Sequence, residues 1–174
     1  LLTTNTTDGP VVPVAHREIA FIDAGLEDLQ ALLDQLTDLD NTDIHFIDHD
    51  TDGLAMVSSV LADSTVDYSA IHFVTHGSDG AIDFGNTLLD LSNAAEFQSQ
   101  LASWGLHLTA DADILFYGCD VAQNEAGQQL LSSIALWTGA DVAGSDDLTG
   151  HADLSGDWDL EFATGNIESQ LLFN

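Results

Sequence analysis

Positive charge is almost absent from this sequence. Its 174 residues include one Lys or Arg against 30 Asp and Glu, which gives a formal net charge of −29. A surface with one basic side chain cannot neutralise phosphates, so we exclude nucleic acids and anionic membrane surfaces as partners. Hydrophobic residues still make up 45% of the chain, too many for an acidic disordered segment. We therefore expect a folded protein.

Cysteine and long apolar runs are also scarce. The single cysteine, Cys119, excludes an internal disulfide, and no run of about 18 apolar residues predicts membrane insertion. Residues 1–10 lack the basic and apolar regions of a signal peptide, and a start at Leu1 suggests a segment of a longer chain. Residues 1–16, rich in Thr, Asn, Asp and Pro, predict a linker, and residues 17–174 predict a single, monomeric domain.

The excess of carboxylates has two explanations, which the sequence does not rank. An acidic surface keeps a protein soluble in a salty environment, and carboxylates are also the ligands that Ca²⁺ prefers. Residues 48–53 match the start of an EF-hand loop, with Asp48, Asp50 and Asp52 as candidate ligands. Position twelve of that loop is Ser59 rather than Glu, so we prefer a strand-to-helix turn capped by Asp52. We assign no metal site and expect no cofactor in the chemistry, with Ca²⁺ left open as an activator or stabiliser.

Short apolar runs alternate along the chain with longer segments in which leucines and other apolar residues recur every three or four positions, as on one face of a helix. The runs predict strands at 19–24, 43–48, 70–75, 113–117 and 140–144, and the helical spacing predicts helices at 26–36, 52–61, 93–106 and 127–137. Glycines in 80–90 predict a hairpin, and 157–168 predicts two further short strands. This order predicts an α/β three-layer sandwich with a mainly parallel central sheet and small antiparallel hairpins.

Two of the predicted strands end in residues that could do chemistry. His76 follows the strand at 70–75, and Cys119 follows the strand at 113–117; each stands beside a glycine. Functional groups collect at the carboxyl ends of parallel strands, so neighbouring strands would place the imidazole beside the thiol. Such a pair supports nucleophilic catalysis by a thiolate. The alternative is a buried, inert cysteine and a packed histidine.

These two blocks resemble the signatures of the caspase-like cysteine peptidases. They are IHFVTHG at 71–77 and ILFYGC at 114–119. Most of the chain from residue 17 to 168 is also similar to a domain of originally unassigned function in giant secreted bacterial adhesins and RTX-type calcium-binding repeat proteins. The stretches that carry this second similarity are REIAFIDAGLEDLQALL, HGSDGAIDFG, ADILFYGCDVA, TGADVAGSDDLTG and GDWDLEFATGNIE.

The resemblance implies a role for individual residues. Cys119 would be the nucleophile and His76 the general acid and base, with the backbone N–H groups of Gly77 and Cys119 forming the oxyanion hole. Relatives that cleave after Arg or Lys often use an acidic residue in the specificity pocket. Candidates for that substrate-binding residue are Asp23, Asp146 and Asp147.

The leading hypothesis is therefore a cysteine endopeptidase module of a large, secreted surface protein, with an extracellular or cell-surface location. Its substrate would be a peptide segment of its own parent chain or of a neighbouring surface protein. Arg17, the only basic residue, is a candidate self-cleavage site, although a surface arginine at the start of a strand is the preferred interpretation. The alternative function is a catalytically inactive caspase-like structural or recognition module of a calcium-dependent adhesin.

Overall fold

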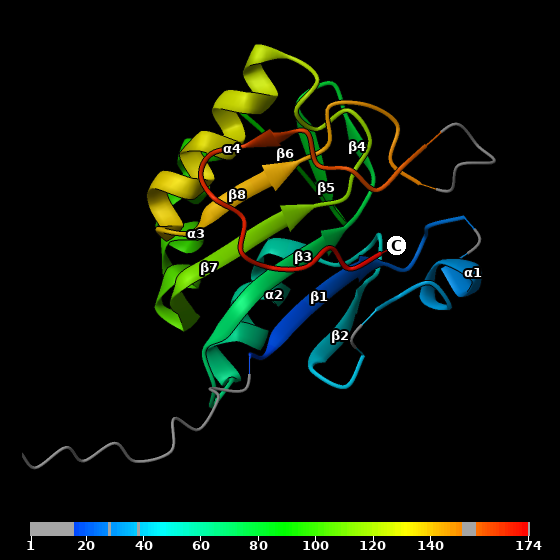
Figure 1. Cartoon of the computed structure of the whole chain (residues 1–174). Coiled ribbons are helices and arrows are strands. Elements are labelled where there is room, and N and C mark those ends of the chain that lie inside the picture. The colour runs from blue at the N-terminus through cyan, green and yellow to red at the C-terminus, as the bar shows by residue number, and fades with distance from the viewer. Residues whose placement is uncertain (1–15, 28, 38, 151–155, 174) are drawn as a thin grey trace, which may run out of the picture.

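A six-stranded sheet forms the centre of the molecule (Figure 1). The computed structural model describes residues 16–27, 29–37, 39–150 and 156–173. The first five strands of the sheet are parallel, and the last is antiparallel to its neighbour. In spatial order they are β2 (Thr42–Ile47), β1 (Glu18–Asp23), β3 (Tyr68–Val74), β7 (Leu108–Phe116), β8 (Asp141–Gly144) and β9 (Phe162–Ala163).

The two faces of this sheet are covered by different kinds of structure. One face packs against α2 (Gly53–Asp63), α3 (Gln98–Trp104), with its flanking 3₁₀ turns η1 (Ala94–Phe97) and η2 (Gly105–His107), and α4 (Glu125–Thr138). The other face packs against the short α1 (Leu29–Leu33) and the C-terminal segment, residues 164–173, which crosses the sheet as an irregular strap (Figure 1). The predicted three-layer α/β sandwich is therefore confirmed.

A small antiparallel sheet stands beside the main one. It consists of β4 (Gly77–Ser78), β5 (Ala81–Phe84) and β6 (Thr87–Asp90), which confirms the hairpin predicted near 80–90. Its first strand begins directly after His76, so this small sheet fixes the chain that leaves β3. Within the described ranges, no helix combines the length and the apolar character that crossing a membrane requires.

The centre of the helix-covered face is an aromatic cluster around Phe73. This side chain is fully buried and packs against Phe21, Phe84 and Phe116, with ring centroids 5.0 to 5.6 Å apart. Every residue of β3 is buried, because both faces of this strand are covered. A parallel strand covered on both sides needs a continuous apolar run, which is the pattern that made this strand recognisable in the sequence.

The segment before α2 is a strand-to-helix turn capped by Asp52, as the sequence analysis preferred over a calcium-binding loop. The side chain of Asp52 accepts a hydrogen bond from the Ala55 N–H at 3.0 Å and so caps the helix. Asp48, Asp50 and Asp52 are all exposed. None of them belongs to a group of three potential metal ligands within the described residues.

Two predicted elements differ from the structure. The helix expected at 26–36 is only the five residues of α1, because its flanking leucines pack on the sheet outside a helix, and Leu36 instead bridges to Phe173. The two strands expected within 157–168 reduce to the two residues of β9. The apolar residues that follow β9 pack on the face of the sheet, and of these Phe173 forms an isolated bridge with Leu36 instead of belonging to a strand.

Truncation of Phe73 tests the packing. Phe73→Ala should lower the free energy of unfolding by about 3–5 kcal/mol, because it leaves a cavity among four aromatic rings. Urea unfolding followed by circular dichroism measures this. Phe46→Ala is the control: Phe46 is 43% exposed, so its loss should cost much less. Equal losses for the two variants would contradict the packing described here.

Candidate functional site

The chain segments that leave β3 and β7 lie against each other. The two strands are parallel neighbours, and their last register pair is Phe73 with Phe116. A Cβ atom placed on Gly77 would lie only 2.7 Å from the carbonyl oxygen of Cys119, so the backbones of these two residues are in contact. The structure therefore brings the ends of the two predicted strands together, as the sequence analysis expected of neighbouring strands.

His76 and Cys119 line the same pocket, which has a volume of about 450 Å³. His76 is exposed and Cys119 is half-buried. The pocket is built from four parts of the chain: the ends of β3 and β7, the segment from the end of β1 through α1, and the loop after β8. Its lining residues are Leu26, Glu27, Ala31, Leu32, Gln35, Val74, Thr75, His76, Tyr117, Cys119, Thr149, Gly150 and Trp158.

The chain turns sharply after Cys119. Asp120 has a φ of 59°, a left-handed conformation that is uncommon for residues other than glycine. Its N–H donates to the carbonyl oxygen of Asp147 at 2.8 Å, which holds the turn against the loop after β8. The Cys119 thiol donates to the carbonyl oxygen of Thr149 in that same loop, with a sulfur–oxygen distance of 3.6 Å. The loop after β8 thus positions both the backbone and the side chain around the cysteine.

The carboxyl group of Asp83 interacts electrostatically with His76 and with Asp23. The Asp83 N–H donates to the His76 carbonyl oxygen at 3.0 Å, which places Asp83 on the strand facing His76. Burial raises the pKa of Asp83, the nearby charge of Asp23 raises it further, and His76 opposes both by lowering it. Asp23 itself is buried and accepts a hydrogen bond from the Gly25 N–H at 2.7 Å. Asp83 therefore links His76 and Asp23 electrostatically beside the pocket.

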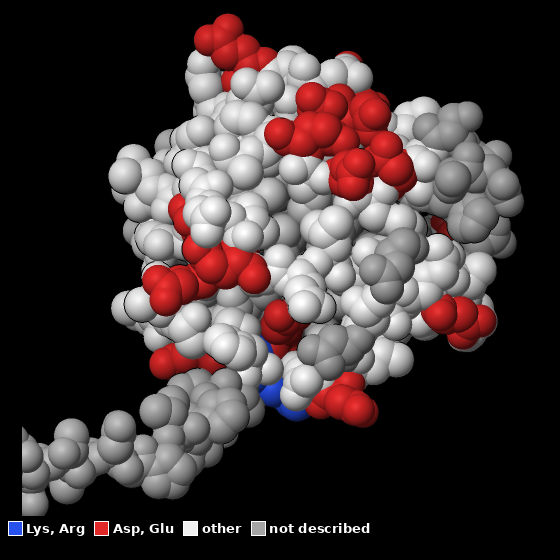
Figure 2. Space-filling model, in the orientation of Figure 1, with Lys and Arg blue, Asp and Glu red and all other residues white. Residues whose placement is uncertain are grey.

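The three acidic residues proposed for substrate binding stand outside the pocket lining. Asp23 is the last residue of β1 and interacts with Asp83. Asp146 and Asp147 are exposed in the loop after β8. Loss of hydration and the neighbouring carboxylates, Asp157, Asp146 and Asp120, raise the pKa of Asp147. These residues form an acidic rim next to the cysteine turn, and Figure 2 shows that Asp and Glu gather in separate patches on this side of the molecule.

Two pocket residues were missed from the sequence. Glu27 is exposed and contributes a carboxylate to the pocket lining. The sequence offered one indication of this role: Glu27 lies four residues after the end of β1, and residues at the carboxyl ends of parallel strands collect at one end of the sheet. Trp158 is partly buried against the second face of the sheet and also lines the pocket. Its ring stacks on Phe173, with centroids 4.0 Å apart, so the C-terminal segment supports this wall.

The sequence was compared with known protein families, curated proteins and solved structures. Residues 19–174 match the model of the family described as Domain of unknown function (DUF4347). The chain belongs to this family. No curated protein and no solved structure matches the chain. The pocket with Cys119 and His76 lies within the part of the chain that defines this DUF4347 domain.

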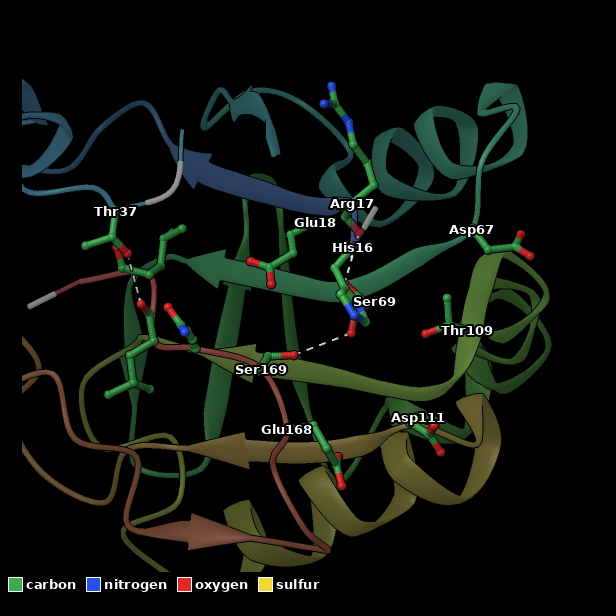
Figure 3. Close-up of a pocket in the computed structure, with 13 residues that line it drawn as sticks. His16, Arg17, Glu18, Thr37, Asp67, Ser69, Thr109, Asp111, Glu168 and Ser169 are labelled. Carbon is green, nitrogen blue, oxygen red and sulfur yellow. Dashed lines mark hydrogen bonds between the residues drawn. The ribbon is translucent and has the colours of Figure 1, made fainter. Parts of the chain in front are cut away.

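A second pocket, with a volume of about 580 Å³, is lined by residues at the amino-terminal ends of β1, β3 and β7 (Figure 3). Arg17 contributes to it and is held by the carboxylate of Asp43, which also accepts a hydrogen bond from the Tyr68 hydroxyl at 3.0 Å. Arg17 precedes β1, and the Cys119 pocket is at the carboxyl end of this sheet, so the six residues of β1, about 20 Å, separate them. Self-cleavage at Arg17 within one molecule would require Arg17 to leave Asp43.

Substitution of Gly77 tests the contact between the two segments. Gly77→Ala should lower stability by about 1–3 kcal/mol, because the new methyl group overlaps the Cys119 carbonyl and the Val121 side chain. It should also change the alkylation rate of Cys119. Ser78→Ala, at the next and exposed position, is the control and should leave both quantities unchanged. If Gly77→Ala matched Ser78→Ala in thermal unfolding and in alkylation with iodoacetamide, the contact would be disproved.

Proposed function

We propose that this DUF4347 domain is a cysteine endopeptidase with a caspase-like arrangement of its active site. One observation carries the proposal: His76 and Cys119 line a single pocket at the ends of adjacent parallel strands. The pocket is open to solvent on the His76 side, and it is large enough to take a peptide side chain.

In the proposed reaction, His76 accepts the thiol proton and the Cys119 thiolate attacks the carbonyl carbon of the scissile peptide bond. The carbon–nitrogen bond then breaks. The leaving amine takes the proton from His76, and the acyl group stays on Cys119 as a thioester. Water, deprotonated by His76, attacks the thioester and releases a carboxylic acid with regeneration of the thiol.

The backbone around Gly77 supplies a donor for the oxyanion that forms in this reaction. Hydrogen-bonded and non-hydrogen-bonded pairs alternate along an antiparallel ladder. The Asp83 N–H donates to His76, so the following pair, Gly77 with Ile82, is of the non-hydrogen-bonded kind. The Gly77 N–H therefore points away from β5, and the Gly77 backbone also contacts that of Cys119. This supports Gly77 in the oxyanion hole, with the Cys119 N–H as the second donor.

The charges around the pocket favour a substrate with a basic side chain. Glu27 lines the pocket, and Asp147 stands on the rim. We propose Glu27 as the residue that pairs with an Arg or Lys before the scissile bond, with Asp146 and Asp147 attracting it from the rim.

A peptide-library cleavage assay tests the activity. Cleavage should be lost in Cys119→Ala and should fall by at least about 100-fold in His76→Ala. His49→Ala is the control, because His49 is exposed and lies outside the pocket lining. A Cys119→Ala variant that cleaves at the wild-type rate would disprove the proposal.

Substitution of Glu27 tests the proposed specificity. Glu27→Gln should lower kcat/KM about tenfold or more for peptides with Arg before the scissile bond, because a hydrogen bond to a charged group is lost. Peptides with Leu at that position should be unaffected. Glu96→Gln, an exposed change in η1, provides the control for charge alone. Equal effects of the two variants on the Arg peptide would exclude Glu27 as the specificity residue.

The proposed setting is a large secreted surface protein of the adhesin type, in which the domain cleaves its parent chain or a neighbouring protein. The acidity of the chain and the similarity of its sequence blocks support this setting. One contact favours the second candidate, an inactive recognition module: the Cys119 thiol donates to the Thr149 carbonyl oxygen.

Thiol alkylation as a function of pH separates the two candidates. A catalytic Cys119 should react with iodoacetamide well below pH 8, and His76→Ala should slow this reaction, whereas an inert thiol should react slowly in both proteins.

A further inference from the structure

Three carboxyl groups meet on the face of the sheet that carries the C-terminal segment. Asp113 on β7 and Asp141 on β8 are register partners on adjacent parallel strands, so their side chains point to the same face. Glu168 reaches them from the C-terminal segment, which crosses the sheet at this point (Figure 3). One carboxylate oxygen from each residue lies within 4.8 Å of the others.

Asp113 is the buried member of this group. Its side chain has no exposed surface, and its Oδ2 accepts hydrogen bonds from the N–H groups of Glu168 and Ser169 at 3.0 and 2.7 Å. Its Oδ1 is also buried and has no hydrogen-bond partner. A buried carboxylate oxygen without a partner is costly and uncommon, so this atom indicates a missing ligand.

The chain supplies no cation to this group. The sequence contains a single Lys or Arg, and that residue, Arg17, is held by Asp43. Like charges directly opposite each other on neighbouring strands destabilise a sheet. The charge of three carboxylates therefore has to be balanced from solution, either by a metal ion or by a proton. Burial raises the pKa of Asp113, hydrogen bonds from the side chain and N–H of Ser169 and from the Glu168 N–H lower it, and the charge of Glu168 raises it.

We propose that Asp113, Asp141 and Glu168 bind a divalent cation, and that this cation is Ca²⁺. An all-oxygen donor set with three carboxylates suits a hard cation, and Ca²⁺ accepts six to eight oxygens at flexible angles. Glu168 is exposed, so water completes the coordination from that side. Gly165 packs directly against the Asp141 carboxylate, since a Cβ atom on Gly165 would collide with it.

The proposed ion would join the sheet to its outer layer. Asp113 and Asp141 belong to the sheet, whereas Glu168 belongs to the C-terminal segment. Four residues further on, the Leu172 N–H donates to the hydroxyl of Tyr117, which lines the pocket. A bound Ca²⁺ therefore stabilises the segment that supports the pocket wall, and this role does not depend on whether the domain is a peptidase.

Two other groups of three acids differ from this one. They are Asp146, Asp147 and Glu161, and Asp157, Asp159 and Glu161. All of their members are exposed, so water can solvate them without a metal ion. They provide a matched control, because they have the same number of carboxylates without a buried, unpartnered oxygen.

Isothermal titration of the metal-free protein with CaCl₂ tests the site at about 0.15 M salt. We expect one Ca²⁺ to bind in the micromolar-to-millimolar range and to raise the unfolding temperature. Glu168→Gln should weaken binding about tenfold or more, and Glu161→Gln should leave it unchanged. Hydrogen exchange should show that Ca²⁺ protects the amides of Glu168 and Ser169.

Asp113→Asn separates a metal site from a proton site. It removes a charge while keeping an acceptor for the two backbone donors, so it should stabilise the metal-free protein and abolish the response to Ca²⁺. A wild-type protein that shows no effect of millimolar Ca²⁺ would overturn the proposal in favour of a shared proton. Equal Ca²⁺ affinity in Glu168→Gln and Glu161→Gln would also overturn it.

Discussion

The parallel pairing of β3 with β7 is the constraint on which the rest of the structure depends. It places Phe73 beside Phe116 in the core, and by the same register it brings the two segments that follow into contact at Gly77 and Cys119. The core and the candidate site are therefore consequences of one alignment. A shift of this register would expose apolar side chains and separate the imidazole from the thiol at the same time.

Repulsion between carboxylates is the main electrostatic interaction in this protein, which has one Lys or Arg against 30 Asp and Glu. With one basic side chain, the protein cannot neutralise its carboxylates by internal ion pairs. It disperses most of them over the surface, where water and salt screen them, and Figure 2 shows these separate acidic patches. Three carboxylates depart from this rule. Asp43 forms an ion pair with Arg17, and Asp83 interacts with both Asp23 and His76. Asp113 is buried, and one of its oxygens has no hydrogen-bond partner.

The sequence predicted the parts of the fold that rest on local patterns. The apolar run of β3 and the capping residue Asp52 were both recognisable, because a strand buried on both faces and a helix N-terminus each have a composition of their own. The placement of His76 and Cys119 at strand ends was also accessible. Glu27 and the group around Asp113 could not be identified from the sequence, because residues that form each site with them are more than 25 positions away in the chain. Among 24 aspartates, moreover, no local feature distinguishes Asp113 or Asp141.

The C-terminal part of the chain, from residue 157 onward, shows a second limit of local sequence patterns. Its apolar residues resembled short strands, but the sheet ends at the two residues of β9. Side chains such as Phe173 are then buried by packing on top of the sheet, against Tyr117 and Trp158. A local apolar pattern predicts that these residues are buried. It does not predict whether they pair with a neighbouring strand or pack on the face of a sheet.

The shortness of α1 gives the two sides of the pocket different local stabilities. None of the five residues of this helix is fully buried, and a helix of this length does not persist without its packing partners. The ends of β3 and β7, in contrast, belong to the fully buried centre of the sheet. We therefore expect the side of the pocket formed by α1 to open locally while the sheet stays folded, so the free energy of that opening controls access to the pocket.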